Sequence, residues 1–189
     1  MDRLEEYAKE NKIPIMQKDG ILFLIDYIKN NNIKTILEIG SAIGYSAINM
    51  ALVDKNIKVT TIERDKTRYN EAIKNIKNFK LENQINIILG DALETNIEGK
   101  YDLIFIDAAK AQYIKFFEKY KENLNKEGVV VSDNLNFHGL TKEDVVIKNK
   151  NLRQLVNKIN KYKDFLKENN EFNTTFLEIG DGIGISKRK

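Results

Sequence analysis

Short apolar runs alternate with helical patterns along most of the chain. Runs that are typical of buried strands occupy residues 35–39, 57–62, 85–89, 101–106 and 129–132. Apolar residues at helical spacing predict helices over residues 2–11, 17–31, 44–53, 66–80, 111–125 and 150–168. Strands that alternate with helices in this way favour a parallel sheet covered on both faces. Because no linker divides the chain, we expect one α/β domain over residues 1–189.

The first strand leads into a glycine turn, with Gly40 and Gly44 four residues apart, before a helix begins. Glycine lets the backbone approach a ligand closely, and a helix N-terminus offers unpaired N–H groups. Glu63 follows the next strand, 23 residues past Gly40, where an acid can accept both hydroxyls of a ribose. These features predict a nucleoside site, although the spacing is not that of a dinucleotide fingerprint. The alternative is a turn that serves only strand–helix packing.

A similar glycine segment, Glu178 to Ser186, lies near the C-terminus. A second nucleoside site would need a helix after these glycines, and only three residues follow. Residues 174–179 and 183–187 instead alternate between apolar and polar positions around Gly180-Asp181-Gly182. This pattern predicts an antiparallel hairpin, and we interpret the likeness to the first glycine segment as coincidence.

Composition narrows the classes of protein that the chain can represent. With 189 residues, 42% of them hydrophobic, the chain can bury one good core. The absence of cysteine excludes disulfides and thiolate metal sites. No apolar stretch approaches the length of a membrane span and the N-terminus is charged, so we expect a cytoplasmic protein with no membrane partner. The net charge of +3 does not by itself demonstrate a nucleic-acid partner.

Acids follow several of the predicted strands. Asp107 and Asp133 each come directly after a strand, and Asn134 follows Asp133. Ligands of open α/β sheets bind at the carboxyl ends of strands, so these side chains are expected to meet there. Their hard oxygens suit Mg²⁺ or Mn²⁺ and leave coordination positions open. Taken singly, Asp107 could instead cap a helix and Asp133-Asn134 could form a turn.

Three motifs, in this order and spacing, resemble the divalent-metal-dependent S-adenosylmethionine O-methyltransferases of the catechol and caffeoyl-coenzyme-A type. They are Glu38-x-Gly40-x-x-x-Gly44-Tyr45-Ser46, Phe105-Ile106-Asp107-Ala108-Ala109-Lys110 and Ser132-Asp133-Asn134. The resemblance covers nearly the whole chain, since residues 13–16 and 90–92 also fit. It implies a Rossmann-like class I methyltransferase fold: a seven-stranded, mostly parallel sheet with a C-terminal antiparallel hairpin and helices on both faces. The N-terminal helices, within residues 1–32, are short for the family.

The resemblance also implies the roles of individual residues. Those assigned to S-adenosylmethionine are Met16, Glu38, Gly40, Ser41, Gly44, Tyr45, Ser46, Glu63, Arg64, Asp91, Ala92 and Asp107. The metal ligands are Asp107, Asp133 and Asn134. Lys110 acts with Asp107 in catalysis, as a base or as a group that positions the accepting hydroxyl; the alternative is an ordinary surface lysine.

Small residues at Ala108 and Ala109 leave the acceptor side open, where catechol enzymes carry larger side chains. This short form resembles the bacterial branch that methylates 5-hydroxyuridine at the tRNA wobble position. A tRNA anticodon stem–loop is therefore the expected partner. Its candidate contacts are His138, Lys148, Lys150 and Arg153. These cations could equally form a solvated helix face, and His138 could have no special role.

Other functions stay open at this point. A small catechol or other vicinal diol would keep the chemistry and change the acceptor. Nicotinamide-dependent hydride transfer would explain Glu63 but not the metal set, and a non-catalytic RNA-binding module would explain only the basic segment. A homodimer is a further expected partner arrangement, although the sequence does not determine the oligomeric state, the preferred metal or the acceptor.

Overall fold

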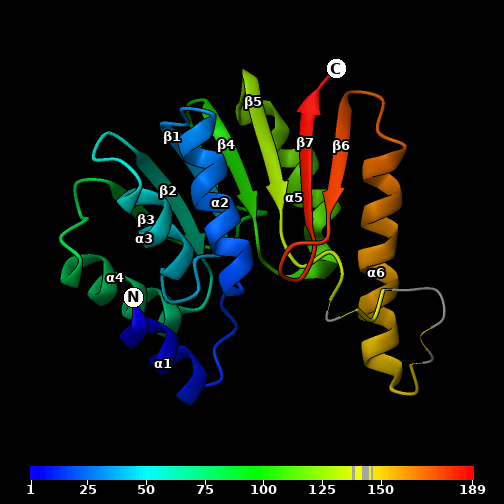
Figure 1. Cartoon of the computed structure of the whole chain (residues 1–189), viewed down its shortest axis with the longest axis horizontal. Helices are drawn as coiled ribbons and strands as arrows, with labels where there is room; N and C mark the ends of the chain where they lie inside the picture. Colours follow the sequence, from blue (N-terminus) through cyan, green and yellow to red (C-terminus); the bar gives the residue numbers. More distant parts are fainter. Residues whose placement is uncertain (138, 142–144, 146) are drawn as a thin grey trace.

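The computed structural model describes residues 1–137, 139–141, 145 and 147–189. Its centre is a seven-stranded sheet in the order β3-β2-β1-β4-β5-β7-β6. The strands are β1 (Thr35–Ile39), β2 (Lys58–Glu63), β3 (Ile85–Leu89), β4 (Tyr101–Ile106), β5 (Leu124–Ser132), β6 (Phe172–Leu177) and β7 (Ile183–Arg188). Strands β1 to β5 are parallel, and β7 runs antiparallel to both β5 and β6 (Figure 1). The expected fold is confirmed.

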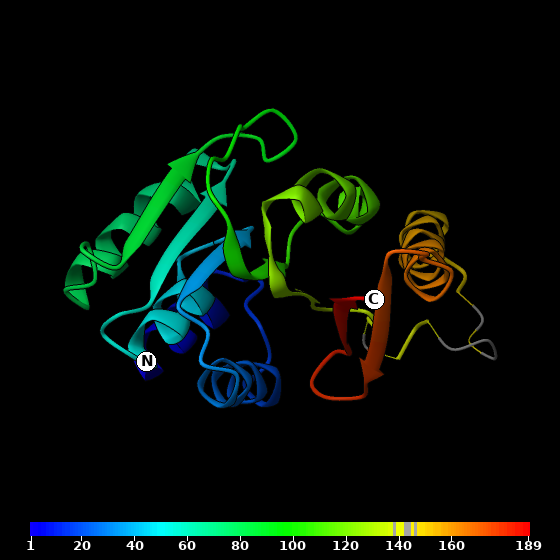
Figure 2. The ribbon, with the colours of Figure 1, turned by 90° about the horizontal axis from the view of Figure 1, so that it is seen from above.

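Helices cover both faces of this sheet. They are α1 (Asp2–Glu10), α2 (Lys18–Asn30), α3 (Tyr45–Leu52), α4 (Lys66–Asn78), α5 (Tyr113–Tyr120) and α6 (Lys150–Lys167), with the short 3₁₀ turns η1 (Lys110–Gln112) and η2 (Lys121–Asn123). Residues of α1 to α4 join one buried apolar cluster, and residues of α5 and α6 join a second. Figure 2 shows α2 and α5 on opposite sides of the central strands. Among the described residues, no helix has both the length and the apolar character needed to cross a bilayer.

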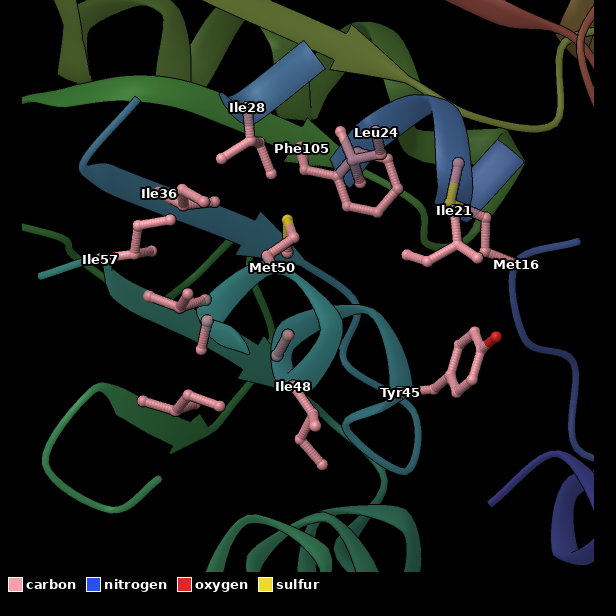
Figure 3. Close-up of a cluster of buried hydrophobic side chains, with 14 of the residues drawn as sticks. Met16, Ile21, Leu24, Ile28, Ile36, Tyr45, Ile48, Met50, Ile57 and Phe105 are labelled. Carbon is pink, nitrogen blue, oxygen red and sulfur yellow. The ribbon is translucent and has the colours of Figure 1, made fainter. Parts of the chain in front are cut away.

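The first cluster shows why the apolar spacing of α2 produces this packing. Ile21, Leu24 and Ile28 recur at intervals of three and four residues, so they lie on one helix face. That face packs toward Ile36 of β1 and Phe105 of β4 (Figure 3), and all five side chains are at most 3% exposed. Burying each of them contributes about 1.5–3 kcal/mol, which fixes α2 against the strands that carry the site.

The prediction of one helix over residues 111–125 is wrong in its extent. The segment is divided into η1, α5 and η2, and β5 begins at Leu124, earlier than predicted. The Asn123 side chain donates to the carbonyls of Ile97 (2.9 Å) and Gly99 (3.1 Å), and Leu124 then pairs with Tyr101 of β4. Helical periodicity could not reveal this ending, because the contacts that impose it come from a distant loop.

The C-terminal hairpin is confirmed, and its glycine turn contacts the loop that follows β5. The Leu135 N–H donates to the Gly182 carbonyl at 2.9 Å, and the Asn136 N–H donates to the Asp181 carbonyl at 2.7 Å. Gly182 has φ +86°, and a Cβ there would lie 2.7 Å from the Asn136 nitrogen. The turn therefore supports the loop after β5 and begins no helix.

Candidate active site

A cavity of about 290 Å³ lies where the strand order reverses, between the carboxyl ends of β1 and β4. This is the place at which open α/β sheets bind ligands. Most of the predicted site residues line it: Met16, Gly40, Ser41, Tyr45, Ser46, Glu63, Arg64, Asp91, Ala92, Asp107, Lys110 and Asn134. The tertiary structure thus gathers into one cavity residues that the sequence separates by more than a hundred positions.

Backbone atoms of the segment after β4 lie close to the first glycine of the turn, Gly40. Gly40 has φ +97°, and a Cβ there would lie 2.3 Å from the Asp107 carbonyl oxygen and 3.1 Å from the Ala108 Cα. Gly40 is therefore required because the ends of β1 and β4 meet backbone to backbone. Gly44 has φ +83° and precedes α3 as its N-cap, with Ala72 of α4 beside it. Gly44 does not line the cavity, and its left-handed backbone turns the chain into α3.

Glu63 lies at the end of β2 with its carboxylate held by backbone groups. The Ala42 N–H donates to one carboxylate oxygen and the Asp65 N–H donates to the other, each at 2.8 Å. The side chain is 6% exposed and lines the cavity. Each oxygen retains a lone pair, so Glu63 can accept further hydrogen bonds without moving.

Glu38, which was assigned to the cofactor-binding set, lies behind the wall of the cavity. It is fully buried and does not line the cavity. The Ser46 hydroxyl donates to one carboxylate oxygen, and the Thr61 hydroxyl donates to the other at 2.5 Å. Burial raises the pKa of Glu38 to about 7, although these two hydroxyl groups lower it. Glu38 therefore orients Ser46, which does line the cavity.

Ser41 is the clearest sign that the cavity receives a polar ligand. Its hydroxyl is buried, and it has no hydrogen-bond partner among the residues that the structure describes. Leaving a buried hydroxyl unsatisfied costs about 1–3 kcal/mol. Because Ser41 lines the cavity, a bound polar group can remove that cost.

The N-terminal residues form another wall. Pro14, Ile15 and Met16 line the cavity after α1. The Tyr45 hydroxyl, at the start of α3, donates to a Glu5 carboxylate oxygen of α1 at 2.8 Å. This contact ties α1 to the helix that follows the glycine turn.

The acids predicted to bind a metal follow adjacent strands. Ile106 of β4 pairs with Ser132 of β5, so the next residues, Asp107 and Asp133, lie side by side on strands about 5 Å apart. The Asp133 N–H donates to the Ile106 carbonyl at 3.1 Å, which continues the ladder to this point. Asn134 then adopts φ +68° and lines the cavity.

Asp107, Asp133 and Lys110 place two carboxyl groups and one ammonium close together, in what we call the acidic corner. Burial raises the pKa of Asp133 well above its usual range, and the neighbouring Asp107 carboxylate raises it further. The Lys110 ammonium donates to Asp107 at 2.9 Å. Burial lowers the pKa of Lys110, but Tyr113 and Asp107 outweigh burial and raise it above its ordinary value. Lys110 is therefore a cation in this structure.

The residues present fit a divalent cation. No group of three or more His, Cys, Asp and Glu side chains able to hold a metal occurs in the described part of the chain, and the predicted set has only two carboxylates and an amide. The Asp107 carboxylate raises the pKa of its neighbour Asp133, and the one ammonium beside them, that of Lys110, is paired with Asp107, so added positive charge would be favourable here. Hard oxygen donors of this kind suit Mg²⁺ or Mn²⁺.

Sequence reasoning missed several residues of the site. Tyr113 is buried, and its hydroxyl donates to the Asp133 carbonyl at 3.1 Å while its ring lies 5.3 Å from the Lys110 ammonium. Its position three residues after Lys110 would place it near Lys110 on a helix, which was a signal of a role in the site. An aromatic residue in a predicted helix, however, more often belongs to the hydrophobic core. Further residues line the cavity without having been predicted, among them Arg68, Gln112 and Phe116.

The candidate RNA contacts lie outside the cavity. Lys148, Lys150 and Arg153 are exposed at the start of α6 and do not line it. His138 lies outside the described residues. The structure therefore brings most cofactor and metal candidates to one cavity, with Glu38, Gly44 and Asp133 outside its lining, and leaves Lys148, Lys150 and Arg153 away from it.

Comparisons with known proteins agree with this geometry. A family model described as O-methyltransferase matches residues 1–189. A crystal structure from Staphylococcus aureus, provisionally described as a caffeoyl-CoA O-methyltransferase, is 41% identical with a TM-score of 0.95, over 100% of this chain and 91% of that one. Caffeoyl-CoA O-methyltransferase of Stellaria longipes is 28% identical over 99% of this chain and 83% of its own length. The Bacillus cereus O-methyltransferase in complex with SAH shares the fold, at 22% identity and TM-score 0.84 over 100% of this chain and 90% of that one. The chain belongs to the O-methyltransferase family.

Proposed function

We propose that this O-methyltransferase uses S-adenosylmethionine and a divalent cation to methylate 5-hydroxyuridine at the wobble position of tRNA. The observation that carries the proposal is the single cavity that joins a nucleoside-type site to an oxygen-rich acidic corner. Glu63 and Ser41 lie in the first part, and Asp107 and Asn134 in the second. The solved structures of similar fold bound to SAH support the choice of methyl donor.

The nucleoside part would hold the donor through groups that are already fixed. Glu63 would accept the ribose hydroxyls, because its two backbone hydrogen bonds keep its oxygens in place. Asp91 and Ala92 would contact the adenine from the loop after β3. The unsatisfied Ser41 hydroxyl would bond to a polar group of the donor.

The acidic corner would hold the acceptor. Asp107, Asp133 and Asn134 would ligate the cation, which when bound lowers the pKa of an acceptor hydroxyl. Lys110 would leave or share its bond to Asp107 and donate to the acceptor oxygen, since its raised pKa keeps it protonated. Tyr113 would hold the backbone of Asp133 in place through its hydrogen bond to the Asp133 carbonyl.

The remaining contribution is alignment. Methyl transfer needs the acceptor oxygen, the methyl group and the sulfur of the donor in line. Holding two reactants in such an arrangement can supply on the order of 7–11 kcal/mol relative to a bimolecular encounter. The close backbone approach of Gly40 to Asp107 would fix the two halves of the cavity relative to each other.

Three features support a tRNA acceptor. The uridine would present O4 and O5 on adjacent carbons, a pair that one cation can chelate. Ala108 and Ala109 are small, the first half-buried and the second exposed, so a bulky nucleotide would meet little obstruction on that side. Lys148, Lys150 and Arg153 are exposed cations that could neutralise phosphates of the stem.

The second candidate acceptor is a small catechol or other vicinal diol. It is favoured by the relatives named caffeoyl-CoA O-methyltransferase, and it uses the same corner of the cavity. The two acceptors differ in what binds outside the cavity, because only tRNA needs the exposed cations.

The decisive experiment is nucleoside mass spectrometry of tRNA from cells with and without the gene. We expect 5-methoxyuridine to disappear and 5-hydroxyuridine to accumulate when the gene is deleted. Purified enzyme should restore the methyl group with S-adenosylmethionine and Mg²⁺, and not in the presence of a chelator. Unchanged 5-methoxyuridine in the deletion strain would rule out this acceptor.

A binding assay separates the two acceptors in another way. Replacing Lys148, Lys150 and Arg153 by Gln should reduce the salt dependence of anticodon stem–loop binding by about 2–3 in log–log slope. A matched control replaces three exposed lysines from other parts of the chain: Lys55, Lys77 and Lys80. Equal slopes for both triple variants would point to a small-molecule acceptor.

A further inference from the structure

Lys119, near the end of α5, spans the gap to the loop after β3. Its ammonium donates to three backbone carbonyls of that loop: Ala92 at 3.0 Å, Leu93 at 2.7 Å and Thr95 at 2.8 Å. An ammonium has three hydrogens, so every donor of Lys119 is used on this one loop. Among the described residues, no carboxylate lies within ion-pair distance of Lys119, and its charge is balanced by carbonyl dipoles.

Neighbouring side chains of α5 and η2 strengthen the same contact. The Tyr120 hydroxyl donates to the Ala92 carbonyl at 2.6 Å, and its ring lies 5.3 Å from the Lys119 ammonium. The Asn123 amide binds the carbonyls of Ile97 and Gly99 farther along the loop. Lys119, Tyr120 and Asn123 thus hold the loop from residue 92 to residue 99, which we name the clamped loop.

The clamped loop begins in the wall of the cavity. Asp91, Ala92 and Leu93 line the cavity, and the Asp91 carboxylate is oriented by the Leu93 N–H at 2.8 Å. Lys119 does not line it. The lysine therefore touches the back of the segment whose front faces the ligand.

A loop of this length between β3 and β4 needs such support. Residues 90–100 contain no helix or strand, so their order depends on contacts from outside the loop. A wall that is ordered before binding does not have to be ordered by the ligand, which raises affinity. Carbonyl hydrogen bonds to a charged donor are among the stronger contacts available for this purpose.

We infer that Lys119 is a positioning residue for the adenosine half of the methyl donor, acting through the carbonyls of Ala92, Leu93 and Thr95. This inference rests on the proposed donor, S-adenosylmethionine. Its effect is confined to the donor side, because no contact of Lys119 reaches the acidic corner of Asp107, Asp133 and Asn134.

The test compares Lys119→Met with Lys115→Met, an exposed lysine on the same helix. Calorimetry with SAH should give a Kd about tenfold higher for Lys119→Met and within twofold of wild type for Lys115→Met. In turnover assays KM for S-adenosylmethionine should rise while kcat at saturating donor stays within twofold. Hydrogen exchange without ligand should show faster exchange only at amides of residues 92–99.

Each other outcome has a definite meaning. Equal SAH affinity for the two variants would overturn the inference, even if Lys119→Met lowered the melting temperature. A fall in kcat with unchanged KM would also overturn it. If Lys119→Met does not fold, Tyr120→Phe takes its place and should raise Kd several-fold, and no rise would overturn the inference. Failure of the wild type to bind SAH would overturn the proposed function and this inference together.

Discussion

Replacing Gly40 by alanine probes the contact that joins the two halves of the cavity. Gly40 follows β1 with φ +97°, and a Cβ at this position would lie 2.3 Å from the Asp107 carbonyl oxygen. The obstacle is backbone, so no side chain can rotate away from the new methyl group. Accommodation requires β1 and β4 to move apart at their carboxyl ends.

The magnitude follows from two separable costs. A non-glycine residue at such a φ costs about 1–3 kcal/mol. The overlap with Asp107 and Ala108 adds displacement of buried strands, which brings the total loss of stability to roughly 3–5 kcal/mol. Gly99→Ala is the matched control, because Gly99 has φ +90° but a Cβ there would have no neighbouring atom within 4 Å. Gly99→Ala should therefore lose only the free energy that a non-glycine residue at positive φ costs.

The assay is urea unfolding followed by circular dichroism for wild type, Gly40→Ala and Gly99→Ala. We expect Gly40→Ala to lose at least about 2 kcal/mol more than Gly99→Ala, from the overlap alone. Cofactor affinity should fall only in Gly40→Ala, because Gly40 lines the cavity and Gly99 does not. Equal losses of stability in the two variants would refute the reasoning, since they would show that the strands relax at no cost.

Three further changes test other parts of the site. Glu38→Gln should flatten the dependence of stability on pH, because the folded pKa of Glu38 is raised from 4.5 to about 7. In urea unfolding, the wild type should therefore lose about 2–3 kcal/mol of stability as pH rises from about 5 to about 8, and the variant should not. Parallel curves for the two proteins would argue against a protonated Glu38. Glu63→Ala should raise the Kd for SAH at least tenfold by calorimetry with little change in metal affinity, and an unchanged Kd would remove the ribose assignment. Asp133→Ala should abolish metal-stimulated turnover while the Kd for SAH stays within about twofold, because Asp133 is proposed to hold the cation and is not among the groups proposed to hold the donor; loss of both would indicate a structural role.

Local patterns were sufficient for the element types and for the hairpin. The alternation of strands and helices, and the turn residues around Asp181, act over a few neighbouring positions, so they can be read directly from the chain. The division of residues 111–125 could not be read in this way. There the Asn123 side chain and the burial of Leu124 decide where the helix ends, and both depend on partners far along the chain.

The same distinction applies to the site. The adjacency of Asp107 and Asp133 could be predicted because strand ends of a parallel sheet share one edge, a rule that needs only the order of elements; their role as metal ligands stays a prediction. The motif of Glu38 shows that it lies near the turn but not which way its side chain points; Ser46 and Thr61 hold it in the core, behind the cavity. Tyr113 and Lys119 were missed because each acts through backbone carbonyls, which carry no residue signature.

The sequence by itself thus determined the family, the fold and the acids at the strand ends, because these follow from periodicity, turn chemistry and motif spacing within short segments. Only the tertiary structure decided which side chains face the cavity and which support it from behind. That decision depends on contacts such as Gly40 with Asp107 and Lys119 with Ala92, whose partners lie 67 and 27 positions apart in the chain. Such contacts exist only once the chain has folded.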